Sequence, residues 1–181
     1  MVAQNSHMAM PAPATVTSIL GNIFTEKAMA RSYRKKLDGG NAEHLYLARF
    51  EMDRLRLRRK TDRGTDIALV LEQGNRLRHG DVVEIPGRHI VVIQLPEKVV
   101  SVRLNGNDSM EMARAAALAG HAIGNRHRPI SIEGLTISFP AMADTELTLF
   151  KKLFHGLGVE LFTEEKVFLP TVESGGEHHH H

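Results

Sequence analysis

The stretch Val99-Val-Ser-Val-Arg-Leu104, followed shortly by Asn107-Asp-Ser-Met-Glu111, is where the hydrophobic period of the chain changes. The first segment is short and rich in β-branched residues, which is typical of a strand. The second begins with helix-capping residues, and Glu111 stands three positions after Asp108, as in a capping box. A strand that leads into a helix here predicts that the chain changes architecture near residues 95–98.

A helix is predicted to follow this start and to continue through His121. Met110, Ala113, Ala117 and Leu118 fall on one helical face, which we expect to be buried. His121 lies on or beside that face, so we expect it to be packed. Gly124 is placed to end the helix, because glycine readily adopts the left-handed conformation of a helix C-terminus.

Two short strands, residues 129–132 and 135–139, are predicted next, around the turn Glu133-Gly134. Asp144 is a candidate cap for a second helix, and residues 159–162 start a last strand. The expected buried stripe of that helix is Leu147, Phe150, Phe154 and Leu157. With residues 99–104 in front, the order is β-α-β-β-α-β, which predicts a ferredoxin-like domain over residues 98–170.

Residues 15–95 are predicted to be an all-β domain. Short segments that are apolar or alternate between apolar and polar residues, at 15–24, 43–50, 54–60, 66–71, 82–85 and 90–95, are separated by turn signals such as Pro86-Gly87. Residues 31–41 are basic and end in the turn-forming Asp38-Gly39-Gly40. The predicted fold class is therefore α+β, with an N-terminal β-rich domain followed by a ferredoxin-like domain.

Both ends of the chain are expected to be flexible. Residues 1–14 are polar and rich in proline and alanine, without periodicity, and are predicted to be disordered. Residues 171–181 end in His178, His179, His180 and His181. This run is either part of a purification tag or a natural metal-binding tail, and the sequence leaves both readings open.

Composition excludes several classes of function. No run of 18 apolar residues and no signal-peptide core are present, so we expect a cytoplasmic protein without membrane contact. The formal charge of +2 does not indicate nucleic acid. The arginines of residues 54–60 alternate without aromatic residues between them, which favours a solvated or protein-docking face over a nucleic-acid site.

Chemistry-bearing motifs are few. The chain has no cysteine, no glycine-rich phosphate loop, no nucleophile elbow and no paired carboxylates, so we predict that it is not an enzyme. A metal site must therefore use imidazole and carboxylate. His127, between Arg126 and Arg128, is predicted to be exposed and is the candidate ligand. One imidazole binds a metal weakly, but a two-fold dimer would supply two from one position, and imidazole suits Ni, Cu and Zn.

These residues carry a resemblance to a known family. Over about residues 15–170 the chain resembles the urease accessory protein UreE family. The matching stretches occur in the family's order and spacing: Gly124-Asn125-Arg126-His127 after a helix, and residues 63–69, 77–83, 95–99, 157–158 and 168–170.

The resemblance implies a homodimeric nickel metallochaperone that loads apo-urease together with an accessory GTPase. In the family the histidine matching His127 binds nickel at the dimer interface, the N-terminal domain binds peptides, and many members end in a His-rich tail. Some members carry further histidines on the strand matching residues 135–139, which here has none. The alternative is a metal-independent interaction module that binds a partner peptide through its β domain. A metal-assisted hydrolase would need a nearby base that the sequence does not supply.

Overall fold

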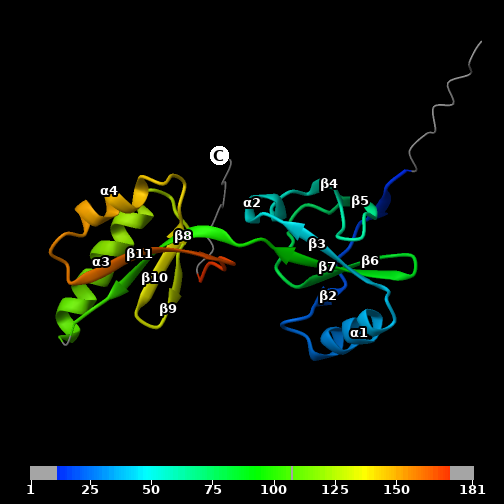
Figure 1. Ribbon diagram of the computed structural model, residues 1–181, viewed down its shortest axis with the longest axis horizontal. Coiled ribbons are helices and arrows are strands. Elements are labelled where there is room, and N and C mark those ends of the chain that lie inside the picture. The colour runs from blue at the N-terminus through cyan, green and yellow to red at the C-terminus, as the bar shows by residue number, and fades with distance from the viewer. Residues whose placement is uncertain (1–11, 107, 172–181) are drawn as a thin grey trace, which may run out of the picture. The chain divides into compact units, whose positions relative to one another are not determined.

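The computed structural model describes residues 12–106 and 108–171 (Figure 1). The chain divides into two compact units, Met1–Leu95 and Pro96–His181. The predicted terminal tails, including His178–His181, fall largely outside the described residues. Within the described residues, no helix is long and apolar enough to cross a membrane.

Two sheets form the N-terminal unit. One has the order β1-β5-β4, from Ala14–Val16, Asp66–Val70 and Arg56–Lys60; the other has the order β2-β6-β7-β3, from Gly21–Asn22, Asp81–Ile85, Arg88–Gln94 and Ala42–Leu47. A single hydrophobic core includes residues of both sheets. The predicted alternation is confirmed, because Leu57, Ile67 and Leu69 are all buried.

The N-terminal unit is not all-β, which corrects the prediction. Residues expected to be a basic segment and turn form helix α1, Lys27–Asp38, and a short helix α2, Arg49–Met52, follows β3. The predicted strand 15–24 is instead β1 and β2, which lie in different sheets. Met29, Tyr33 and Leu37 do repeat at helical spacing along α1, but none of them is fully buried, and the cations between them make the segment look like a basic loop.

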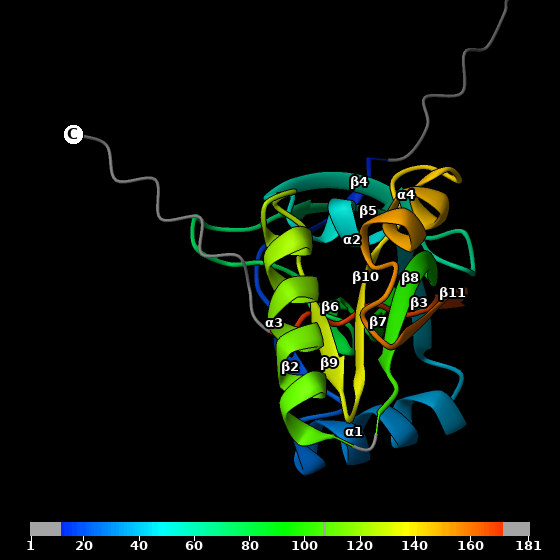
Figure 2. The ribbon, with the colours of Figure 1, turned by 90° about the vertical axis from the view of Figure 1, so that its left-hand side faces the viewer.

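The C-terminal unit has the element order β-α-β-β-α-β. Its elements are β8 Glu97–Leu104, α3 Ser109–Gly124, β9 Ser131–Glu133, β10 Thr136–Pro140, α4 Glu146–Leu153 and β11 Val159–Lys166. The sheet order is β11-β8-β10-β9, and every neighbouring pair is antiparallel. Both helices pack against this sheet (Figure 2), through a core that includes Val102, Ile123, Phe139 and Phe150.

The caps of the two helices differ from each other. Asp108 caps α3 as predicted, because its Oδ1 accepts the backbone N–H of Met110 at 2.8 Å. Asp144 does not cap α4. The N-cap is Thr145, and Asp144 instead accepts from Nζ of Lys98 on β8 at 2.6 Å. A lysine within reach on the neighbouring strand offers a charged partner that the sequence pattern does not show.

Helix α3 buries a different face from the one predicted. Ala115, Ala119 and Ile123 are buried. Met110 and Leu118 of the predicted face are 79% and 42% exposed. Because α3 carries alanines on several sides, periodicity does not choose between its faces, and packing against the sheet decides which face is buried. An apolar stripe of α3 is therefore left facing outward.

Candidate functional site

The end of α3 is an unusual turn that presents His127. The backbone N–H of His127 donates to the carbonyl of Gly124 at 2.8 Å, and that of Asn125 donates to the carbonyl of His121 at 2.9 Å. His127 has φ of 53° and is the one non-glycine residue with positive φ among residues 12–106 and 108–171. Helix α3 ends at Gly124, as the sequence predicts. The left-handed backbone conformation, however, belongs to His127 and not to Gly124.

The two arginines beside His127 are held by the rest of the domain. Arg126 donates to the carbonyl of Ala122 at 2.8 Å, and its guanidinium lies 5.2 Å from the ring centroid of Phe150. Arg128 forms an ion pair with Glu146 on α4, in which the two side chains are only 14% and 13% exposed. The contacts of both arginines therefore stabilise the turn that contains His127.

His127, between these two arginines in the sequence, is exposed. No group of three or more histidine, aspartate or glutamate side chains that could hold a metal occurs among the described residues. Within one chain the site thus offers a single imidazole, whose neutral form can donate one nitrogen lone pair to a metal ion.

His121 is not packed into the core, contrary to expectation. It is exposed on α3, and its Nε2 lies 2.9 Å from Nδ2 of Asn125. An amide NH₂ only donates, so Nε2 of His121 accepts the hydrogen bond and its proton is on Nδ1. This bond occupies one nitrogen of His121.

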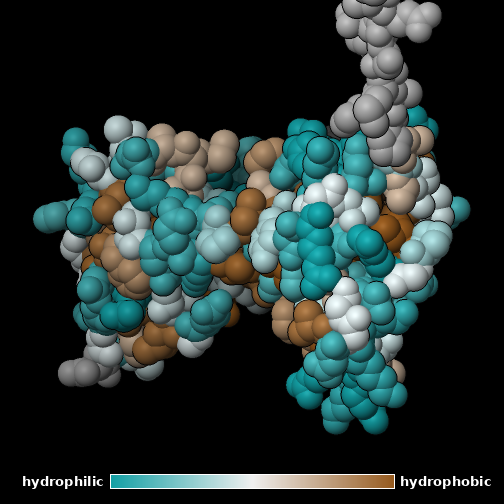
Figure 3. Space-filling view, turned by 45° about the vertical axis from the view of Figure 1, so that its right-hand side comes forward, coloured by the Kyte–Doolittle hydropathy of each residue, from teal (hydrophilic) through white to brown (hydrophobic). Residues whose placement is uncertain are grey.

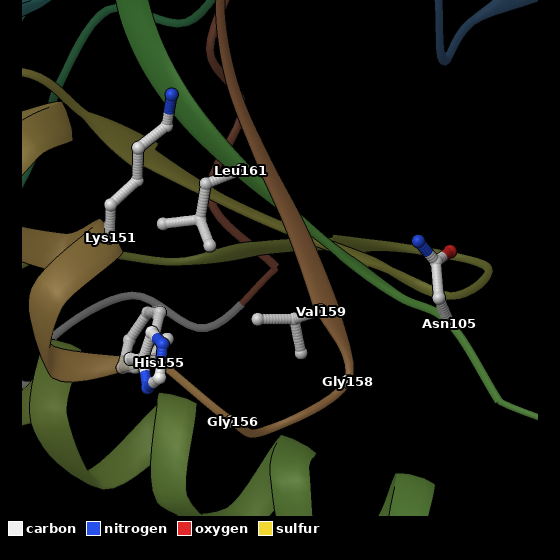
Figure 4. Close-up of a pocket in the computed structure, with 8 residues that line it drawn as sticks. Asn105, Lys151, His155, Gly156, Gly158, Val159 and Leu161 are labelled. Carbon is white, nitrogen blue, oxygen red and sulfur yellow. The ribbon is translucent and has the colours of Figure 1, made fainter.

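Concave surface in the C-terminal unit lies at the loop between α4 and β11. One pocket of about 500 Å³ is lined by residues that include Asn105, Lys151, His155 and Leu161. Figure 4 shows the amine of Lys151 pointing away from His155, with Asn105 on the far side of β11. The polar groups therefore do not converge on one point, as the groups of a small-molecule site do.

A hydrogen-bonded chain that the sequence did not suggest joins α1 to the N-terminal sheet. The hydroxyl of Tyr33 lies 2.7 Å from Nε2 of His44, and Nδ1 of His44 lies 2.9 Å from Oδ2 of Asp62. Burial raises the pKa of Asp62, but hydrogen bonds from His44 outweigh it and hold that pKa below its usual value. The carboxylate therefore accepts from Nδ1–H of His44, and Nε2 of the same ring shares a hydrogen bond with the hydroxyl of Tyr33.

Another network lies on the sheet of the C-terminal unit. Oγ of Ser101 lies 2.8 Å from Oγ of Ser138 and donates to Glu164 at 2.7 Å, while Nζ of Lys166 donates to Ser138 at 3.2 Å. The hydrogen bond from Ser101 is the main cause that lowers the pKa of Glu164. Carboxylates of Glu164 and Glu133 lie 3.4 Å and 3.7 Å from Nζ of Lys166. This is an ion-pair network, and it does not activate either serine as a nucleophile.

Comparison with known proteins finds relatives that match most of this chain. The family model of the UreE urease accessory protein, N-terminal domain, matches residues 16–95. A urease accessory protein UreE of Lysinibacillus sphaericus is 32% identical over 165 residues, covering 91% of this chain and 99% of that protein. One of Natronomonas pharaonis is 31% identical over 132 residues, covering 73% and 61%. One of Haemophilus influenzae is 32% identical over 127 residues, covering 69% and 63%.

In the last two comparisons the matched region spans about three fifths of the relative's length. The Lysinibacillus protein, however, is matched over nearly all of its length at 32% identity. The chain belongs to the UreE urease accessory protein family.

Proposed function

We propose that this chain is a non-enzymatic, cytoplasmic metallochaperone that binds nickel and delivers it to apo-urease during assembly of the active site. The observation that carries the proposal is the presentation of His127. It is exposed at φ of 53°, between two arginines that are held by Phe150 and Glu146. A backbone conformation that L-residues rarely adopt, kept at an exposed imidazole, is a feature from which function is reasonably inferred.

A two-fold dimer would complete the site, with one His127 from each subunit. The outward stripe of α3 supports this part of the proposal, because Met110, Ala113, Ala117 and Leu118 are exposed apolar residues on the helix that leads to His127. Burying this stripe against a second copy would remove apolar surface from water, and in a two-fold dimer the same stripe of both subunits would meet. The open coordination positions would allow nickel to be passed on.

The partners proposed are those that the resemblance implies: a second copy of the chain, the urease apoprotein complex and an accessory GTPase. We further propose that residues 98–170 are a ferredoxin-like metal-binding domain, which the β11-β8-β10-β9 order supports. Residues 15–95 would be the peptide-binding domain. Zn and Cu would also bind, because imidazole does not select strictly among these ions.

The terminal histidines are proposed as additional ligands. Thr171, the last described residue, donates its backbone N–H to the carbonyl of Ile130 at 2.9 Å, so the tail starts beside the strand that follows His127. An extended chain from Thr171 reaches His178 within roughly 25 Å.

Calorimetric titration with Ni and Zn tests the proposal. The starting protein lacks residues 174–181, so that the tail cannot bind metal. We expect His127→Ala to abolish high-affinity nickel binding, and His155→Ala, which removes another exposed histidine, to leave it unchanged. Nickel binding that survives His127→Ala in this shortened protein would overturn the proposal.

A metal-independent interaction module is the second candidate. Phe50 on α2 is 64% exposed and Tyr46 on β3 is 48% exposed, and large aromatic side chains are enriched in protein interfaces. This candidate predicts that nickel changes neither the dimerisation nor the partner binding of the protein that lacks residues 174–181.

A further inference from the structure

We propose that the outward face of α1 is a docking surface for an acidic segment of a partner protein. The surface consists of Lys27, Arg31, Arg34 and Lys35, and we call it the α1 ridge. It is separate from the proposed nickel site, which lies in the other unit of the chain. Hydrophilic residues cover the lower right of Figure 3, which corresponds to the position of α1 in Figure 1.

Helical spacing places the four cations of the α1 ridge in one row. They stand at intervals of four, three and one residues, so that they fall on one side of α1, and all four are exposed. Among the described residues none of them forms an ion pair; Arg31 donates only to the carbonyl of Lys27, at 3.3 Å. Asp38 is the one acidic residue on this face.

Helix stability does not explain the α1 ridge. Lys27 and Arg31, and likewise Arg31 and Lys35, are like charges four residues apart, which destabilise a helix. Lys27 also stands at the N-terminal end, where the helix dipole disfavours a cation, and the first turn holds no acidic residue. Only Lys35 and Lys36, in the last turn, favour the helix.

The arginines of β4 differ from the α1 ridge, although the sequence singled them out. Arg58 donates to Asp66 through both Nε and Nη2, at 3.1 Å and 2.7 Å, and Arg59 is paired with Glu51. Much of the charge on β4 is therefore neutralised within the domain. The cations of the α1 ridge are not neutralised in this way and can interact with an oppositely charged partner. Complementary charge both attracts and orients a partner protein.

The opposite side of α1 indicates which anionic partner fits. That side faces the sheet: α1 contacts β3 and β7, and Tyr33 is bonded to His44. Leu37, 42% exposed, is the one large apolar side chain that the described residues of α1 leave open to water, which is too little apolar surface to hold a helix in a bilayer. The α1 ridge has no aromatic residue on which a nucleic-acid base could stack. Carboxylates of a protein segment remain the best match for exposed lysine and arginine.

Fluorescence anisotropy with a labelled glutamate-rich peptide tests the proposal on the full chain. The ridge variant changes Lys27, Arg31, Arg34 and Lys35 to Gln, which keeps helix propensity. The matched control changes Arg56, Lys60, Lys151 and Lys152 to Gln, so that the same net charge is lost from exposed positions elsewhere. We expect the ridge variant to bind the peptide roughly tenfold or more weakly, and the control to bind it like the parent.

Equal losses in the two variants would overturn the proposal, because they would show an effect of net charge alone. Ridge-dependent binding of a short DNA duplex, or of phosphatidylcholine vesicles containing phosphatidylserine, that is tighter than binding of the peptide would also overturn it. The pair Lys27→Gln and Arg31→Gln, which removes charges at the unfavourable end of α1, provides a second variant should the fourfold change unfold the helix. Circular dichroism monitors folding, and nickel binding should be unchanged in every variant.

Discussion

The backbone N–H of His127 donates to the carbonyl of Gly124 at 2.8 Å, and the turn that this bond closes holds His127 at φ of 53°. Left-handed backbone costs an L-residue about 1–2 kcal/mol, whereas glycine adopts it freely. The residue proposed to bind the metal is therefore also a site of local backbone strain. Strain and metal binding can be separated by substitution.

We expect His127→Gly to be more stable than His127→Ala by roughly 0.5–1 kcal/mol, because glycine relieves the strain but gains chain entropy when unfolded. Both variants should lose nickel binding equally, since both lack the imidazole. Urea denaturation measures the stability difference, and calorimetry measures nickel. A glycine variant less stable than the alanine variant would show that the turn is not left-handed at this residue.

The ion pair between Arg128 and Glu146 should stabilise the fold substantially. Arg128→Met leaves Glu146 without its partner, and we expect a loss of about 2–4 kcal/mol, since breaking a largely buried pair leaves an uncompensated charge. Glu146 also accepts the N–H of Met142 at 2.7 Å. Adding Glu146→Gln to Arg128→Met should recover part of the loss in thermal denaturation. If the two losses are simply additive, the pair is not coupled.

The buried positions of regular strands follow more readily from the sequence than the buried faces of helices do. Alternation at Leu57, Ile67 and Leu69 marks buried positions because each strand has one face on the core. In α3 the many alanines make several faces nearly equivalent, so the buried set Ala115, Ala119 and Ile123 is decided by packing with the sheet.

The turn around His127 is likewise only partly predictable from the sequence. Exposure of His127 follows from its position after a helix, but its left-handed backbone does not. Histidine and asparagine adopt this conformation more often than most residues, so Asn125 and His127 are both candidates for it from the sequence. The sequence does not choose between them. The pairing of Arg128 with Glu146 joins residues 18 positions apart and depends on tertiary structure alone.

Acid should weaken the N-terminal unit through Glu43, which is only 1% exposed. Burial raises the pKa of Glu43, but hydrogen bonds from Thr61 and Thr65 and the ion pair with Arg88 together hold it below its usual value of 4.5. Because the folded-state pKa is lowered, the stabilisation is full above pH 4.5 and is lost as pH falls through the folded value.

Glu43→Gln should therefore be destabilising near neutral pH and much less so in strong acid. Urea denaturation of parent and variant across this range measures the difference. Glu72→Gln, which removes a carboxylate from an exposed loop, is the matched control and should show little effect at any pH. A pH-independent cost of Glu43→Gln would mean that the ionised carboxylate is not what the native state favours.

The outward stripe of α3 makes a prediction about assembly. Leu118 on α3 and Leu149 on α4 are equally exposed, at 42% and 44%, so a charge at either position costs the monomer a similar amount. Only Leu118 belongs to the proposed dimer face. We expect Leu118→Glu to shift the protein to monomers in sedimentation velocity and to weaken nickel binding, because each monomer keeps a single His127. Leu149→Glu should remain dimeric and bind nickel like the parent. If Leu118→Glu stays dimeric with unchanged nickel affinity, the two-fold site is built from a different face, and the imidazole of His127 must find its other ligands elsewhere.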